Sequence, residues 1–323
     1  SEKVLDAEEE KLTNALSKLL RPGKRVVYVL QGHGGHELGN TERAGFSEAK
    51  AAMERSNYEV KPLVLAREGT IAADAALVIL PGPRTDLFAP ELDALDGYVG
   101  RGGKLLVMVN PFQNAGLKTY LAKYGFELAN DLVVEPNPIG RLFGIGPEVP
   151  IVQQYEPHPI TRDMGGITTL FPLTRSLSAA KTPPQGVTVQ VLARTSAQSW
   201  GETNRQALEQ GQAQPDAQDA KGPLAVAAVA TRDKARIVLY GTSALASNQF
   251  LNVQGNRDFF LNTVSWLADE ENLIAIRPKE TRQTPVFLTS LQAQAVFLLP
   301  VVVLPGIVVI GGIVAFFRRR SAK

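Results

Sequence analysis

Residues 75–109 read AALVILPGPRTDLFAPELDALDGYVGRGGKLLVMV, and this stretch gives the clearest indication of fold class. Two apolar runs, residues 75–80 and 104–109, flank a helical pattern at residues 90–101. Pro90 suits the first turn of that helix, and Gly102-Gly103 suits its end. Strand, helix and strand in this order predict a parallel sheet covered by helices.

The same alternation continues on both sides of this stretch. Upstream, the strand Arg25–Leu30 (RVVYVL) precedes a helix at 42–56 and a strand at 58–65. Downstream, a helix at 113–124 precedes a strand at 127–134. These elements predict an α/β domain with a Rossmann-like or flavodoxin-like sheet.

Residues beyond 222 return to the α/β pattern after an interruption. Strands at 223–230 and 235–240 and a helix at 256–269 are expected to join the first sheet. The predicted α/β domain therefore comprises residues 24–135 and 223–269.

The intervening residues 136–222 carry short β-like pieces, such as 166–170 and 186–193, broken by Pro and Gly. They predict a β-rich insertion. Within it, residues 201–221 (GETNRQALEQGQAQPDAQDAK) are polar, Gln-rich and aperiodic, which predicts a solvated, flexible loop.

The loop 31–37 (QGHGGHE) follows the first strand, where open α/β sheets place their ligands. It supplies the candidate ligand- or partner-binding residues, together with the turn after the third strand: His33, Gly34, His36, Glu37, Pro81 and Gly82. Two histidines and a carboxylate can ligate a metal, but no third His or Cys stands at a diagnostic spacing. We therefore expect no metal, and a turn-forming loop in which His33 packs or hydrogen-bonds against neighbouring strand ends.

Other motifs argue against familiar catalytic sites. Residues 100–104 (GRGGK) end a helix and enter a strand, the reverse of a phosphate loop, and no Walker A motif is present. Ser243 follows a strand but lacks the second glycine of a nucleophile elbow. The absence of cysteine excludes thiol nucleophiles and Cys-ligated metals, and a net charge of +2 gives no indication of nucleic-acid binding. We expect no cofactor and no catalytic residue.

The C-terminal residues 295–317 (AVFLLPVVVLPGIVVIGGIVAFF) predict a transmembrane helix. They contain no charged residue, and 23 helical residues span about 34 Å, enough to cross a hydrocarbon core of about 30 Å. Small residues at Gly306, Gly311 and Gly312 predict close packing against another membrane helix.

The basic residues Arg318, Arg319 and Arg320 follow the predicted span and favour a cytoplasmic C-terminal tail (318–323). Residues 24–269 would then lie outside the cytoplasm, joined to the span by a juxtamembrane linker at 270–294. The N-terminal residues 1–23 predict an amphipathic helix with no export signal, so we expect that the chain lacks its natural beginning. A tail-anchored protein with a cytosolic domain is the competing interpretation.

The ordered motifs resemble one family over most of the chain. They are SEKVLDAEEEKLTNAL, VVYVLQGHGGHE, NYEVKPLVL, LVILPGPRTDL, ALDGYVGRGGKLLVMVNP, IVLYGTSALASN and NRDFFLNTVSWLADE, followed by the span and RRR. This order is similar to the GldG-type auxiliary proteins of ABC transporters, known from gliding motility. The resemblance extends to a wider group that shares a glutamine-amidotransferase-like domain with intraflagellar-transport proteins. Where the family tends to have Gly-His-Gly-Glu, this chain has Gly35 after Gly34, with Glu37 two positions late.

The resemblance implies a non-enzymatic auxiliary subunit in the bacterial inner membrane. Its extracytoplasmic domain would have an amidotransferase-like fold and bind a substrate or partner, and its partners would be ABC permease and ATPase subunits and the lipid bilayer. It also implies an upstream span and a further domain before residue 1. The alternative is a membrane-tethered, hydrolase-like enzyme that uses the loops at the strand ends.

Overall fold

The computed structural model describes residues 24–113, 115–136, 146–269 and 305. The predicted N-terminal helix, juxtamembrane linker and basic tail lie outside the described residues, as does the predicted span apart from Pro305. Gly306, Gly311, Gly312, Arg318, Arg319 and Arg320 are therefore outside them too. Within the described part of the chain, no helix is both long and apolar enough to cross a membrane.

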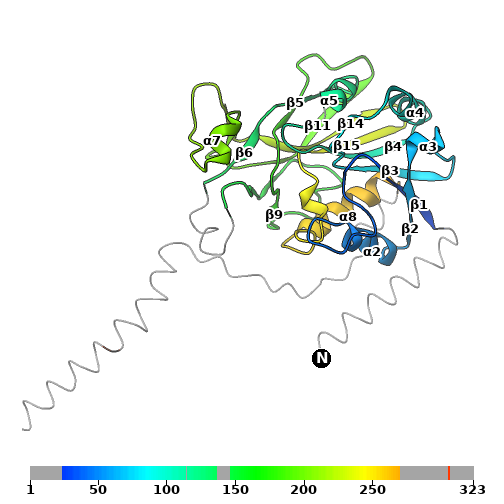
Figure 1. The fold of residues 1–323 in the computed structure, drawn as a ribbon, viewed down its shortest axis with the longest axis horizontal. Helices are drawn as coiled ribbons and strands as arrows, with labels where there is room; N and C mark the ends of the chain where they lie inside the picture. Colours follow the sequence, from blue (N-terminus) through cyan, green and yellow to red (C-terminus); the bar gives the residue numbers. More distant parts are fainter. Residues whose placement is uncertain (1–23, 114, 137–145, 270–304, 306–323) are drawn as a thin grey trace, which may run out of the picture. The chain divides into compact units, whose positions relative to one another are not determined.

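A ten-stranded mixed sheet forms the centre of the domain (Figure 1). Its parallel part runs in the order β2-β1-β3-β4-β15, the order of flavodoxin-like sheets. These strands are β1 (Arg25–Leu30), β2 (Tyr58–Leu63), β3 (Ala75–Pro81), β4 (Lys104–Met108) and β15 (Ala235–Tyr240). The prediction that residues 235–240 rejoin the first sheet is confirmed by the parallel pairing of β15 with β4.

The remaining strands extend this sheet in antiparallel fashion beyond β15. They are β14 (Ala225–Arg232), β11 (Val187–Arg194), β10 (Leu177–Ala179), β8 (Gln154–Tyr155) and β5 (Phe126–Leu128). Three of these strands, β8, β10 and β11, come from the segment predicted to be an insertion. That segment therefore completes the central sheet, because β14 offers it an open edge for pairing.

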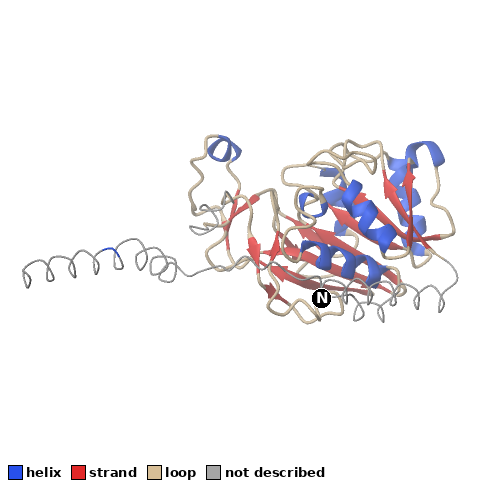
Figure 2. Ribbon diagram, turned by 90° about the horizontal axis from the view of Figure 1, so that it is seen from below, coloured by secondary structure: helices blue, strands red, loops and turns tan. Residues whose placement is uncertain are grey.

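Helices cover both faces of the sheet (Figures 1 and 2). The helices α2 (Ser47–Arg55) and α8 (Asn256–Leu267) cover one face, and α3 (Leu65–Glu68), α4 (Ala89–Gly100) and α5 (Ala115–Ala122) cover the other. Alternate residues of each strand enter the two cores: Val27 and Val29 face α2 and α8, whereas Val26 and Leu30 face α3 and α4. Burying each such side chain contributes roughly 1.5–3 kcal/mol, so the apolar strand runs stabilise both layers at once.

Two small sheets lie beside the central one. The first joins β6 (Leu132–Val134), β12 (Trp200–Glu202) and β13 (Ala220–Lys221), and the second joins β7 (Ile151–Val152) and β9 (Thr169–Leu170). The predicted single strand at 127–134 is thus two strands, β5 and β6, in different sheets.

The polar segment 201–221 differs from the predicted loop, because it contains β13, part of β12 and the short helix α7 (Arg205–Glu209). Polar side chains organise it. The Asn204 side chain accepts a hydrogen bond from the Ala207 N–H (3.1 Å), and Asp219 accepts from the Asp216 N–H (3.0 Å). Side-chain hydrogen bonds therefore order this segment, although its sequence lacks the apolar periodicity that normally indicates a helix or a strand.

Candidate functional site

The carboxyl ends of β1, β3, β4 and β15 meet at one edge of the sheet. In a flavodoxin-like strand order, ligands bind at this edge, where the order reverses between β1 and β3. Each strand is followed here by a short segment with polar side chains: His36 after β1, Arg84 after β3, Asn110 after β4 and Ser243 after β15.

His36 and Ser243 contact each other at this edge. The distance between His36 Nε2 and Ser243 Oγ is 2.9 Å, and His36 Nδ1 lies against the Ala44 carbonyl oxygen. Because that carbonyl only accepts, Nδ1 carries the proton and Nε2 accepts from the Ser243 hydroxyl when the ring is neutral. Burial lowers the pKa of His36, as does the nearby Arg84 guanidinium, and both effects favour the neutral ring.

Asn110 competes with His36 for the same serine. The Ser243 N–H donates to Asn110 Oδ1 at 2.8 Å, and the single proton of the Ser243 hydroxyl can be donated either to His36 Nε2 or to this oxygen, which lies 2.9 Å from Oγ. The next backbone group, the Ala244 N–H, donates to Thr242 Oγ1 at 3.0 Å. Ser243 is only 2% exposed, so its hydroxyl and the two backbone donors are all committed inside the protein.

Gly82 allows these groups to come together. It has a positive φ of 70°, and a Cβ atom at this position would collide with the Ser243 side chain. The neighbouring Pro81 carbonyl accepts the His36 N–H at 3.0 Å, which fixes the histidine loop against the end of β3. Gly82 and Pro81 therefore hold the His36–Ser243 contact in place.

A cavity of about 550 Å³ opens above this contact, and we call it the carboxyl-edge cavity. His36, Asn110 and Ser243 line its floor, and the arginines Arg43, Arg84 and Arg205 line its exposed rim. Its apolar walls include Phe112, Leu132, Leu173, Leu208 and Phe250. Part of one wall comes from α7, so the polar segment 201–221 contributes to the cavity.

The buried Arg175 positions the loop after β4. Its guanidinium donates to the carbonyl oxygens of Ala129 (Nε, 2.7 Å), Asn110 (3.3 Å) and Gln113 (3.2 Å). Burial lowers the pKa of Arg175, while the charge of Asp131 opposes that shift. Arg175 is 2% exposed and does not line the cavity, so its role is to hold residues 110–113 in place.

The sequence-predicted loop residues separate into two groups. His36 lines the cavity, and Gly34 and Gly82 pack against lining residues, Arg84 and Ser243. His33 instead lies buried, with Nε2 3.0 Å from Glu91 Oε1, and Glu91 also accepts the Phe88 N–H at the start of α4 (2.8 Å). His33 thus hydrogen-bonds across the β3–α4 connection.

Glu37 is exposed and does not line the carboxyl-edge cavity. Within the described ranges, no three His, Cys, Asp or Glu side chains lie close enough together to hold a metal ion.

Sequence reasoning gave Ser243 no role and did not single out Asn110 or the three arginines. The signal that could have found Asn110 and Ser243 is their position, since each lies just beyond a buried strand that was predicted correctly. Arg84 has the same kind of position, just beyond β3. Arg43 and Arg205 carry no such signal, because they lie on a loop and on α7, whose placement depends on the tertiary fold.

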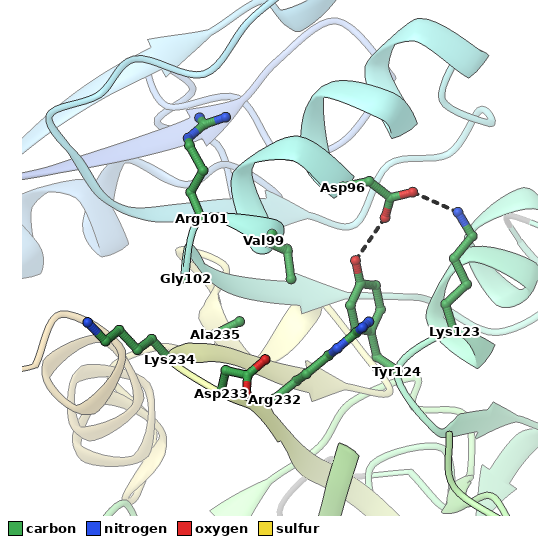
Figure 3. A pocket seen from close by; sticks show the side chains of 11 residues that line it. Asp96, Val99, Arg101, Gly102, Lys123, Tyr124, Arg232, Asp233, Lys234 and Ala235 are labelled. Carbon is green, nitrogen blue, oxygen red and sulfur yellow. Dashed lines mark hydrogen bonds and ion pairs between the residues drawn. The ribbon is translucent and has the colours of Figure 1, made fainter. Parts of the chain in front are cut away.

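A second cavity, of about 560 Å³, lies at the opposite edge, between the α4–β4 and β14–β15 turns (Figure 3). Asp96 there accepts hydrogen bonds from Lys123 (2.7 Å) and Tyr124 (2.8 Å), so the positive charge of this lysine is already paired with a carboxylate. Figure 3 shows Arg101 and Lys234 extending away from each other. Because its cations diverge, this cavity is the weaker candidate for a ligand site.

A solved structure that is similar to this chain shares its fold. The mmIFT52 N-terminal domain matches with 17% identity and a TM-score of 0.57, covering 75% of this chain and 97% of that domain. A protein from Bacteroides uniformis, described as ThuA-like, matches with 13% identity and a TM-score of 0.48 over 76% of this chain and 91% of its own. No curated protein matches the chain.

A family model described as an ABC-type uncharacterized transport system matches residues 24–266. The match spans the whole α/β domain, from the start of β1 to the last turn of α8. It thus includes every residue that lines the carboxyl-edge cavity. The chain therefore belongs to this family of auxiliary components of ABC-type transport systems.

Proposed function

We propose that the chain is a membrane-anchored auxiliary subunit that acts beside permease and ATPase subunits of an ABC-type transport complex. The family supports a role in transport, and the apolar residues 295–317 support the anchor. The basic residues 318–320 favour a cytoplasmic tail, which leaves the domain 24–269 outside the cytoplasm, at the inner membrane of a bacterium.

In this proposal the domain binds a ligand or partner in the carboxyl-edge cavity and does not catalyse a reaction. The observation that carries this is the set of bonds around Ser243. A serine hydrolase needs a hydroxyl that donates to the histidine alone and backbone N–H groups that are free for the developing oxyanion. Here the hydroxyl lies against Asn110 as well as His36, and the Ser243 and Ala244 N–H groups already donate to side chains.

Cysteine labelling tests the proposed topology. The sequence contains no cysteine, so an introduced cysteine provides the thiol that is labelled. One cysteine replaces the exposed Gln212, and a second variant carries one at Ser321. An impermeant thiol reagent added to intact spheroplasts should label the first variant and leave the second unlabelled until the membrane is permeabilised. The reverse pattern would mean a tail-anchored protein with a cytosolic domain.

A second candidate function, a serine hydrolase, is favoured by the 2.9 Å contact between His36 and Ser243. The Ala44 carbonyl oxygen orients the His36 imidazole, as a carboxylate orients the histidine of a catalytic triad. A fluorophosphonate probe separates the two functions, because it reacts with activated serines. We expect no labelling above that of Ser243→Ala; labelling that disappears in both Ser243→Ala and His36→Ala would establish the hydrolase.

A further inference from the structure

We propose that the carboxyl-edge cavity binds a small organic anion, with a carboxylate or phosphate group at its rim and an apolar part against its walls. This inference deepens the proposed binding function and rests on it. Three kinds of observation support it: the charges of the rim, the strained apolar residues of the wall and a buried acceptor without a partner.

The rim carries an excess of positive charge. Arg43, Arg84 and Arg205 line the cavity together with a single carboxylate, Glu209. Among the described residues, no ion pair joins any of these guanidinium groups to a carboxylate. A guanidinium offers planar, paired donors that match a carboxylate or phosphate, so three of them at one opening favour an anionic ligand.

Arg205 is held in place before any ligand arrives. Its guanidinium lies over the Phe112 ring, 4.9 Å from the ring centroid, and its helix α7 is capped by Asn204. Such a cation–π contact limits the rotamers of a long side chain without satisfying its N–H groups. The contact therefore holds the guanidinium N–H donors at the rim. Less side-chain entropy is then lost when a ligand binds.

Two bulky apolar residues of the wall have unusual backbone conformations. Phe112 has a φ of 58° and Leu173 a φ of 48°, a region that side chains with large groups rarely adopt. The other non-glycine residues with positive φ in the described part are polar Asn, Asp and Gln. Each such conformation costs about 1–3 kcal/mol, and they are concentrated at ligand sites.

Leu173 is also 51% exposed, although the cavity beside it is lined by further apolar side chains such as Leu208 and Phe250. A ligand with an apolar part would remove this surface from water. Gln113 lines the cavity as well, and its buried Oε1 has no hydrogen-bond partner among the described residues. A hydroxyl or amide N–H of the ligand would satisfy this acceptor.

The test uses the full chain in phosphatidylcholine nanodiscs and isothermal titration calorimetry. The probes are phenyl phosphate and phenylacetate, which combine an aromatic ring with either anion, and inorganic phosphate and benzyl alcohol, which each lack one part. We expect saturable, one-site binding of at least one aromatic anion, and weaker binding of both partial probes. Preference for phenyl phosphate or phenylacetate would identify which anion the rim selects.

Four variants locate the binding. Arg84→Gln and Arg205→Gln should each weaken it about three- to tenfold, because an exposed charge-assisted contact is lost. Glu209→Gln should strengthen it. Arg232→Gln, in the second cavity at the opposite edge, is the matched control and should change nothing. Thermal unfolding of each variant shows that it is folded.

Two results would overturn the inference: no saturable binding of either aromatic anion, or equal affinity in Arg84→Gln and Arg232→Gln. Co-purification of transporter subunits with the chain is measured separately. A chain that assembles with them but binds no anion would refute the inference alone, whereas anion binding by a chain that assembles with no transporter subunit would refute the proposed function.

Discussion

Gly82 shows how one small residue sets the geometry of the site. It combines a positive φ of 70° with close packing against Ser243 and Asn110, whereas Gly69 has nearly the same φ (68°) and nothing within 4 Å of a Cβ position. The two glycines therefore separate the cost of backbone strain from the cost of a collision.

The first prediction compares these two positions. Gly69→Ala should lower the free energy of unfolding by about 1 kcal/mol, the cost of a left-handed conformation. Gly82→Ala should lower it by about 2–4 kcal/mol, because the new methyl group also displaces Ser243. Denaturant unfolding followed by tryptophan fluorescence measures both. Equal losses would show that Ser243 moves aside without cost.

The second prediction concerns the buried Arg175. Arg175→Met should cost about 3 kcal/mol or more, because the Ala129, Asn110 and Gln113 carbonyl oxygens lose their donor in a buried place. The exposed Arg162 is the control, and Arg162→Met should change stability by less than about 0.5 kcal/mol. If both substitutions cost the same in urea, the loop 110–113 does not depend on Arg175.

At the scale of elements, the sequence predicted those strands that are continuous apolar runs and those helices that show a helical apolar pattern. The strands β1, β3, β4 and β15 are long buried runs, and their pattern alone indicated a parallel sheet. The strands β8 and β10, which join the central sheet from the predicted insertion, have only two and three residues, too few to show alternation. Their pairing with distant partners is determined by the tertiary fold, so the sequence could not distinguish an insertion from an extension of the sheet.

The third prediction tests a helix end that depends on a distant side chain. Asn248 Oδ1 accepts the Glu48 N–H of α2 at 2.9 Å, and its Nδ2 donates to the Asn40 and Glu42 carbonyls at 2.9 and 2.7 Å. Asn248→Ala should cost about 2–3 kcal/mol and accelerate hydrogen exchange in α2. Asn204→Ala, which removes only the local cap of α7, should cost about 1 kcal/mol. Unchanged exchange in α2 would contradict this.

At the scale of the whole molecule, an α/β sheet with ligand loops at its carboxyl edge could be anticipated, but the strand order and the contacts at the site could not. The sequence placed a ligand loop after the first strand, and the flavodoxin-like order puts that loop at the switch point. Ser243, however, is 207 positions from His36 and 133 from Asn110. The parallel pairing of β1, β3, β4 and β15 in this order brings these residues together, and no local pattern records which strands are neighbours.

The fourth prediction concerns stability at acid pH, which we expect to depend on His158 and its neighbours Arg236 of β15 and Trp266 of α8. The His158 ring lies 4.7 Å from the Trp266 ring, and its Nδ1 accepts the Ile160 N–H. Burial, together with the charge of the nearby Arg236, lowers the pKa of His158 to about 4. The unfolded chain, with an ordinary histidine pKa of about 6.5, therefore binds more protons than the folded one between these values.

Stability contributed by neutral His158 is thus fully present above about pH 6.5 and decreases as the pH falls towards about 4. Because the ring is partly exposed, solvent screening limits the loss to roughly 1–2 kcal/mol. The free energy of unfolding at pH 7 and pH 4.5 measures it, and His158→Gln should make this part of the pH dependence disappear. An unchanged slope in His158→Gln would mean that other groups produce it.

The most direct test of the central claim is purification of the tagged full chain from native bacterial membranes in mild detergent. The account predicts that a permease and an ATPase with a Walker A motif are recovered with it in fixed ratio, and that mass spectrometry identifies both. It also predicts that Ser243→Ala leaves this recovery unchanged, because Ser243 is not needed for assembly. Recovery of the chain alone, or only with proteins that are no part of a transporter, would contradict the assignment as a transport subunit.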